Sequence, residues 1–218
     1  MSYALDGIDI RMRKYLNYDN GFFIECGAND GVTQSNTCLY EQQFGWTGLL
    51  VEPCPINFNK CKQSRPNSIV ENFALVRDSY EQNKISGYFD PHCYNGLMSP
   101  ILDTPEYFDE EQKSSKADFI EKFHLVPVEV SCCTLQSLLD KHSIQQVDFF
   151  SLDVEGYELE VLEGFNFNKV KPTYILIETT TTESRRDMMK DYMDKHSYDF
   201  VEQLTGNDAL FQYSEDNR

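Results

Sequence analysis

GFFIECGANDG, residues 21–31, is the stretch that decides the fold. Its short apolar and aromatic run, with a glycine before and after it, is typical of a strand buried in a parallel sheet. The run then breaks into a turn, where Gly27 and Gly31 can take backbone angles or close approaches that a side chain forbids. Open α/β sheets bind ligands at such junctions, beside the carboxyl ends of their strands. We expect a ligand site here; the alternative is a tight connection between a strand and a helix.

The acids in and after this stretch indicate which ligand it suits. The glycine spacing is G-x-x-x-G, not the G-x-G-x-x-G of dinucleotide-binding proteins. Glu25 and Asp30 would repel a pyrophosphate and favour a cationic ligand. A second apolar run, residues 48–51, ends in Glu52, which lies 25 residues after Gly27. An acid at that place commonly accepts the ribose hydroxyls of a nucleotide; the alternative is a solvated glutamate at a strand end.

Two blocks of the sequence resemble the FkbM-type methyltransferases. They stand in the family's order and together cover most of residues 20–180, which makes the resemblance specific. It implies a class I fold that binds S-adenosylmethionine (SAM) and transfers its methyl group, commonly to a hydroxyl oxygen, but it does not fix the acceptor. The first block comprises FIECGANDG (23–31), SNT (35–37), GWTG (45–48) and VEP (51–53), and the second comprises DFFSLDVEGYE (148–158) and VLEG (161–164).

The chain as a whole predicts one α/β domain, residues 1–218, with the Rossmann-like fold of class I methyltransferases. We expect a mostly parallel sheet with helices on both faces and a C-terminal antiparallel hairpin, residues 198–203 and 209–213. That ending favours a methyltransferase over a dinucleotide-binding sheet of repeated βαβ units. We also expect the first helix to pack on the sheet edge. After the first strand, the expected strands are residues 48–51, 68–76, 147–152 and 173–178, and the expected helices are residues 8–16, 35–44, 56–62, 134–142, 158–163 and 184–195.

Residues 77–125 fit the repeated strand–helix pattern least. Residues 85–90 and 126–131 resemble the two strands of an added hairpin, and a long connection between them is uncommon in a compact domain unless it is a lid or binding loop. We therefore expect an insertion at 85–131, with residues 90–99 over the active site and Tyr94 offering a stacking face to a sugar. The alternative is a loop that only covers the domain.

Composition and net charge limit the classes of partner that this protein can bind. The chain has 218 residues, 40% of them hydrophobic, and a net charge of −17. Nucleic acids and anionic membranes attract basic surfaces, so we expect neither as a partner. A small-molecule or glycan hydroxyl carries no such electrostatic penalty. No apolar run reaches the ~18 residues of a membrane span and no signal peptide is evident, which favours a cytoplasmic protein. Seven cysteines without a C-x-x-C pair predict free thiols. The oligomeric state is left open.

The resemblance assigns SAM to residues at the ends of the predicted strands. Glu25 and Asp30 would meet the cationic end of SAM, Glu52 its ribose, and residues 72–74 its adenine. Residues 35–37 can cap the next helix, contact the cofactor or do both, and residues 72–74 can instead be plain core strand. The complete expected set is Glu25, Gly27, Ala28, Asn29, Asp30, Gly31, Ser35, Asn36, Glu52, Pro53, Asn72, Phe73, Ala74 and Asp153.

Asp153 closes the predicted strand 147–152 and is the first candidate for general base or metal ligand. Methyl transfer is an in-line displacement, so the protein mainly positions a hydroxyl and helps to remove its proton. Glu178, at the end of the next strand, can join Asp153 in holding Mg or Mn through oxygen ligands. Asp153 can alternatively cap the following helix, and His92 and His124 are the alternative bases.

Three functions compete for this sequence. The first is a SAM-dependent O-methyltransferase that acts on a sugar or glycan. The second is a nicotinamide-dependent sugar oxidoreductase, but the chain lacks G-x-G-x-x-G and a Tyr-x-x-x-Lys pair near the strand that precedes Asp153. The third is a SAM-binding module without catalysis, which should have lost the acid at position 153. Since Asp153 is present, the sequence favours the first function.

Overall fold

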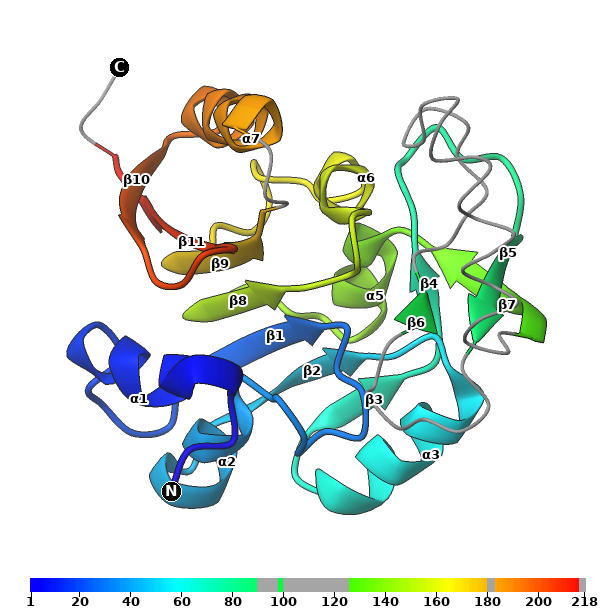
Figure 1. Ribbon diagram of the computed structural model, residues 1–218, viewed down its shortest axis with the longest axis horizontal. Helices are drawn as coiled ribbons and strands as arrows, with labels where there is room; N and C mark the ends of the chain where they lie inside the picture. The colour runs from blue at the N-terminus through cyan, green and yellow to red at the C-terminus, as the bar shows by residue number, and fades with distance from the viewer. Residues whose placement is uncertain (90–97, 100–125, 180–182, 216–218) are drawn as a thin grey trace.

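The computed structural model describes residues 1–89, 98–99, 126–179 and 183–215 (Figure 1). Most of the expected insertion at 85–131, including His92, Tyr94 and His124, falls outside these ranges. The lid expected there therefore stays a prediction. None of the helices within the described ranges has the length and apolarity needed to cross a bilayer.

A seven-stranded sheet runs through the middle of the molecule (Figure 1). In spatial order its strands are β10 (Tyr198–Gln203), β11 (Asp208–Tyr213), β9 (Tyr174–Glu178), β8 (Phe149–Leu152), β1 (Phe22–Cys26), β2 (Thr47–Val51) and β3 (Ile69–Glu71). Strands β9 to β3 are parallel, and β11 runs antiparallel between β9 and β10. The strand order reverses between β1 and β8, which makes their carboxyl ends the switch point where such sheets bind ligands. The predicted α/β sheet with its terminal hairpin is confirmed.

Helices cover both faces of this sheet (Figure 1). One face carries α1 (Ile8–Arg11), α2 (Cys38–Phe44) and α3 (Pro55–Ser64), and the other carries α5 (Leu135–Lys141), α6 (Glu158–Glu163) and α7 (Glu183–Lys195). Because side chains alternate along a strand, β1 contributes to both cores. Phe23 packs with Met12 and Tyr40 on the first face, whereas Ile24 packs with Leu139 on the second.

The N-terminal segment differs from the single helix predicted on the sheet edge. Its apolar spacing does bury Ile8, Met12 and Leu16, but they pack against the face that carries α2, so the expected edge position is wrong. The hydroxyl of Tyr40 donates to the carbonyl of Asp9 at 2.8 Å and ties the segment to that face. It consists of a 3-10 turn (Leu5–Gly7), the single turn α1 and a second 3-10 turn (Met12–Lys14).

The strand predicted over residues 68–76 is divided between two sheets. β3 ends at Glu71, and β4 (Ala74–Leu75) joins a second sheet of order β4-β7-β5-β6, formed with β7 (Val126–Cys133), β5 (Lys84–Phe89) and β6 (Met98–Ser99). At the break, the side-chain amide of Asn72 donates to the carbonyls of Glu52 and Pro53, at 2.8 and 2.9 Å, and holds the chain beside the end of β2. The hairpin predicted from 85–90 and 126–131 is confirmed, since β5 pairs antiparallel with β7.

Candidate active site

The carboxyl ends of β1, β2 and β8 meet at one point. The amide of Gly27 donates to the carbonyl of Val51 at 3.0 Å, and the amide of Asp153 donates to the carbonyl of Cys26 at 3.1 Å. Gly27 has φ +82°, and a Cβ placed on it would lie 1.7 Å from the carbonyl oxygen of Asp153. Both the backbone angle and the contact require glycine here. The turn predicted from the sequence is thus packed directly against the end of β8.

The two acids of the glycine turn are engaged by their own segment. Asp30 accepts hydrogen bonds from the amides of Val32 and Thr33, at 2.9 and 2.7 Å, and from the Thr33 hydroxyl at 2.8 Å. Partial burial opposes ionisation of Asp30, but these bonds outweigh it and lower the pKa. The carboxylate therefore shapes residues 30–33 while it stays charged beside the turn.

Glu25 lies deeper, on the face of the sheet that carries α2. It is 4% exposed, and its carboxylate accepts from the Ser35 hydroxyl, the Asn36 amide and the Thr37 hydroxyl at 2.6–2.8 Å. The Ser35 hydroxyl oxygen also accepts from the amide of Cys38, the first residue of α2, at 3.0 Å, whereas the N-cap residue Thr37 makes no side-chain capping bond. Glu25 thus organises the segment behind the turn. Its expected contact with the cationic end of SAM stays a prediction, as do those of Ser35 and Asn36.

Glu52 connects the end of β2 to the same turn. Its carboxylate accepts from the amides of Asn29 and Cys54, at 2.7 and 2.8 Å. Asn29 itself has φ +49°, a left-handed conformation that asparagine tolerates. Burial raises the pKa of Glu52 to about 7, although both amides lower it. The carboxylate is thus bonded to the glycine turn through Asn29, and its expected contact with the ribose stays a prediction.

The residues expected beside the adenine lie at the branch between the two sheets. Asn72 is fixed by its bonds to the carbonyls of Glu52 and Pro53. Phe73 is half-buried against the core under α5, and Ala74 is buried in the core of the second sheet. The set is therefore held next to Glu52, at the edge where the adenine is expected.

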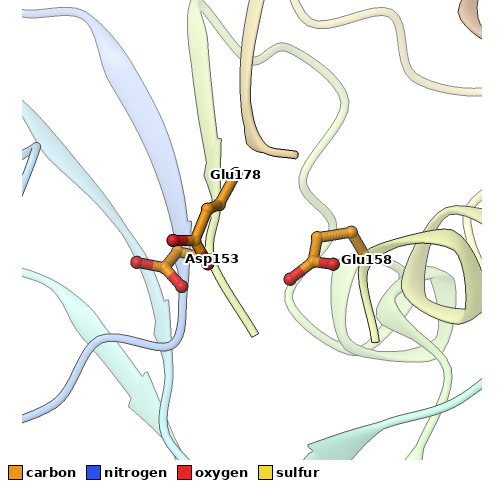
Figure 2. Close-up of side chains that lie close together, drawn as sticks. All are labelled: Asp153, Glu158 and Glu178. Atoms are coloured by element: carbon orange, nitrogen blue, oxygen red, sulfur yellow. The ribbon is translucent and has the colours of Figure 1, made fainter. Parts of the chain in front are cut away.

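Three carboxylates gather beyond the ends of β8 and β9 (Figure 2). Asp153 follows β8, Glu178 ends β9, and Glu158 points toward them from the first turn of α6; one oxygen of each lies within 4.8 Å of the others. Glu158 is held in place by the amides of Val154 and Gly156, at 3.1 and 2.9 Å. The structure thus brings together the two predicted metal ligands. Sequence reasoning did not select Glu158, although it lies in the block that resembles the family.

The electrostatics of these acids favour a proton or a cation between them. Loss of water and the neighbouring carboxylate of Glu178 raise the pKa of Asp153 well above its ordinary value, although one side of the residue is open to solvent. Burial, followed by nearby acids, raises the pKa of Glu155 to about 7, and burial likewise raises that of Glu158 to about 7, against the hydrogen bonds it accepts. Glu155 and Gly156 have φ +58° and +95°, so a tight left-handed turn brings these acids together.

Comparison with known protein families shows which family has this arrangement of residues. Residues 25–204 match the methyltransferase FkbM domain. The chain belongs to the FkbM methyltransferase family. The matched residues include the glycine turn, Glu52, Asp153 and Glu178, and the resemblance found in the sequence is confirmed. No match was found among curated proteins.

Solved structures agree with the FkbM fold. A methyltransferase FkbM from Methylobacillus flagellatus KT superimposes with a TM-score of 0.54 at 14% identity, covering 97% of this chain and 56% of that one. The chain described here therefore spans little more than half the length of that relative. A putative RNA methyltransferase from Pyrococcus horikoshii superimposes with a TM-score of 0.51 at 9% identity, covering 97% of this chain and 82% of that one. The METTL16 methyltransferase domain superimposes with a TM-score of 0.52 at 10% identity, covering 96% of this chain and 67% of that one. At these identities the likeness establishes the class I methyltransferase fold.

Proposed function

We propose that this protein transfers a methyl group from SAM to a hydroxyl of a small molecule, a sugar or glycan. The observation that carries the proposal is the direct contact between the glycine turn and the end of β8: Asp153 lies against Gly27, with Glu52 two strand ends away. The contact is made by the backbone carbonyl of Asp153, and it supports the proposal because it fixes this residue next to the turn where SAM is expected to bind. Membership of the FkbM family supplies the reaction class.

Each part of the site has a role in this reaction. SAM supplies, when bound, a methyl group on a positively charged sulfur. The backbone at Gly27 and Ala28 permits close approach, and Glu52 accepts from the ribose hydroxyls. Asp153 takes the proton of the acceptor hydroxyl. Burial and the neighbouring carboxylate of Glu178 raise the pKa of Asp153, which makes its carboxylate a stronger proton acceptor.

In the alternative form of the proposal, Asp153 does not act as the base but holds a divalent cation together with Glu178. The donor set fits Mg or Mn, since both prefer carboxylate oxygens and the third carboxylate, Glu158, lies within reach of the same point. Such an ion would offset the repulsion that raises the pKa of Asp153. Asp153, Glu178 and Glu158 would hold such an ion, which would supply positive charge to stabilise the acceptor oxygen as it loses its proton.

A neutral acceptor agrees with the charge of the protein. The net charge is −17, and the described carboxyl groups 153, 155, 158 and 178 gather where the acceptor is expected. A phosphate backbone would be repelled there, because nucleic-acid binding depends on neutralising phosphates with basic groups. One similar structure is a putative RNA methyltransferase, and the charge of this chain argues against such an acceptor.

The test combines binding and turnover. Calorimetric titration with SAM, NAD and NADP should give binding to SAM alone; binding to NAD or NADP instead would support the oxidoreductase. Labelled SAM should then pass its methyl group to a component of a glycan mixture and not to RNA. If EDTA abolishes transfer and Mg or Mn restores it, the cation belongs to the reaction; if EDTA has no effect, Asp153 acts alone. SAM binding without transfer to any acceptor would support the third function, a SAM-binding module without catalysis.

A further inference from the structure

One buried arginine holds the back of the glycine turn. Arg65, directly after α3, is 0% exposed. Its guanidinium donates to the carbonyl of Gly31 at 2.9 Å, to the hydroxyls of Ser35 and Thr37 at 3.2 and 3.0 Å, and to the carboxylate of Glu41 at 2.8 Å. A single side chain thus connects the end of the glycine turn to the start of α2.

The neighbours of Arg65 hold the same turn. The hydroxyl of Ser64 donates to the carbonyl of Asp30 at 2.6 Å. A Cβ on Gly31, whose φ is +82°, would lie 2.7 Å from Arg65 Cγ, 2.8 Å from Ser64 Oγ and 2.9 Å from Cys61 Sγ. The end of α3 is therefore pressed against the turn closely enough that only glycine fits, and two successive carbonyls, those of residues 30 and 31, are fixed from behind.

The charges around Arg65 explain why an arginine is needed. Glu41 forms an ion pair with it at 2.8 Å and Glu25 lies 3.6 Å away, and all three side chains are at most 5% exposed. Arg65 offsets the charge of Glu25 at the strand end that begins the turn. A lysine carries one compact ammonium and cannot reproduce the planar fork that reaches Gly31, Ser35 and Thr37 together.

We propose that Arg65 is a positioning residue for the SAM site. It fixes residues 29–37 in the shape that SAM requires before SAM arrives, so that binding does not have to order them. A buried ion pair contributes little net stability, because desolvation of both charges opposes their attraction, whereas it can hold one conformation among several. Preorganisation lowers the cost of binding. This inference rests on the proposed binding of SAM at the glycine turn.

Three variants test the inference. Arg65→Lys keeps the charge and removes the fork. Ser64→Ala removes the hydroxyl that donates to the Asp30 carbonyl at 2.6 Å and, within α3, to the Cys61 carbonyl at 3.1 Å, and it covers the case in which Arg65→Lys does not fold. Tyr198→Phe is the control for a general loss of stability, because it removes the buried hydroxyl bond to the Pro172 carbonyl, 2.9 Å, on the far edge strand β10. The measurements are hydrogen–deuterium exchange of residues 28–38 without ligand, the Kd for SAM, kcat at saturating SAM, and Tm.

We expect Arg65→Lys to raise both the exchange rate of residues 28–38 and the Kd for SAM about tenfold, because charge-assisted bonds to the turn are lost. In the same variant kcat should stay within about twofold, since a bound cofactor restores the turn. Ser64→Ala should move exchange and Kd in the same direction by about threefold, as expected for one neutral bond. Tyr198→Phe should lower Tm and leave the exchange rate of residues 28–38 and the Kd for SAM unchanged.

Unchanged exchange and Kd in Arg65→Lys would overturn the inference, as would changes no larger than those of Tyr198→Phe. If Arg65→Lys does not fold, Ser64→Ala decides in the same way. Failure of the proposed function is recognised separately, because the wild-type protein would then not bind SAM. The exchange measurement needs no ligand, so it still shows whether Arg65 holds the turn.

Discussion

The carbonyl oxygen of Asp153 occupies the space in which a side chain at Gly27 would begin, 1.7 Å from the position of that Cβ. The amide of Asp153 is at the same time bonded to the carbonyl of Cys26, the residue before the glycine. The proposed base and the cofactor turn are therefore parts of one rigid junction between β1 and β8. A change that moves one of them displaces the other.

Gly27→Ala should be severely destabilising. Alanine at φ +82° costs about 1–2 kcal/mol in backbone strain, and the overlap with Asp153 adds about 1–3 kcal/mol or more. Urea unfolding, followed by the fluorescence of the single tryptophan, Trp46, measures the loss. Gly206→Ala is the control, since no atom lies within 4 Å of a Cβ there and its φ is not positive. Equal unfolding midpoints for the two variants would contradict the close contact between Gly27 and Asp153.

Glu52→Ala should weaken SAM binding by about 1–3 kcal/mol, because the ribose hydroxyls lose a charged acceptor and the amide of Asn29 loses its partner. Isothermal titration with SAM measures the Kd. Glu202→Ala is the matched control, as that acid pairs with Lys14 on the surface. A Kd equal to the wild-type value would show that Glu52 does not meet the ribose.

The stability of the ligand-free protein should decrease as the pH rises from about 5.5 to about 8. Glu52 has an ordinary pKa of 4.5 and a pKa of about 7 when folded. Because the folded state binds this proton more tightly, its stabilising contribution is complete below the ordinary pKa and is lost as the pH passes the folded value. Over this pH window the loss for one such group is about 2 kcal/mol.

Glu155, Glu158 and Asp153 act in the same direction, since their pKa values are also raised. Urea midpoints at the two pH values measure the decrease. Glu52→Gln cannot titrate, so its midpoints should lie closer together than those of the wild type. A wild-type midpoint that rises with pH in this window would mean that these carboxyl groups are ionised without cost in the folded protein.

Asp153→Asn should lower turnover about 100-fold or more, because it keeps the shape of the side chain and removes the base or metal ligand. Affinity for SAM should change little, since the carboxyl faces the acceptor side of the methyl group in the proposed arrangement. Single-turnover rates with labelled SAM and a titration of SAM measure the two effects. Near-normal turnover would transfer the role of base to His92 or His124.

The main sheet could be predicted because its strands carry strong local sequence signals, and the same residues are buried in the folded core. Strand β1 is both apolar and followed by glycines, and Thr134, a residue type that favours helix starts, caps α5 by accepting from the Ser137 amide at 3.2 Å. Strands that end in Glu52, Asp153 and Glu178 were found for the same reason. Parallel order then brings their ends to one edge of the sheet.

Other features depend on contacts that have no local pattern. The split between β3 and β4 is accompanied by bonds of Asn72 to residues twenty positions earlier, at Glu52 and Pro53. Arg65 is a lone arginine after a helix, and nothing beside it in the sequence indicates that Gly31 and Glu41 surround it. Glu158 could have been selected from the D-V-E-G-Y-E spacing only by knowing that Glu155 and Gly156 take positive φ.

The split strand has an evolutionary consequence. Only Asn72 and Phe73 join the end of β3 to β4, and β4 opens the smaller sheet that continues into β5, β6 and β7. Insertions and substitutions between β4 and β7 therefore need not disturb the register of β1, β2 and β3, on which the glycine turn depends. Selection can remodel this segment while the cofactor strands stay constant, so paralogues of this protein should diverge first between residues 76 and 125.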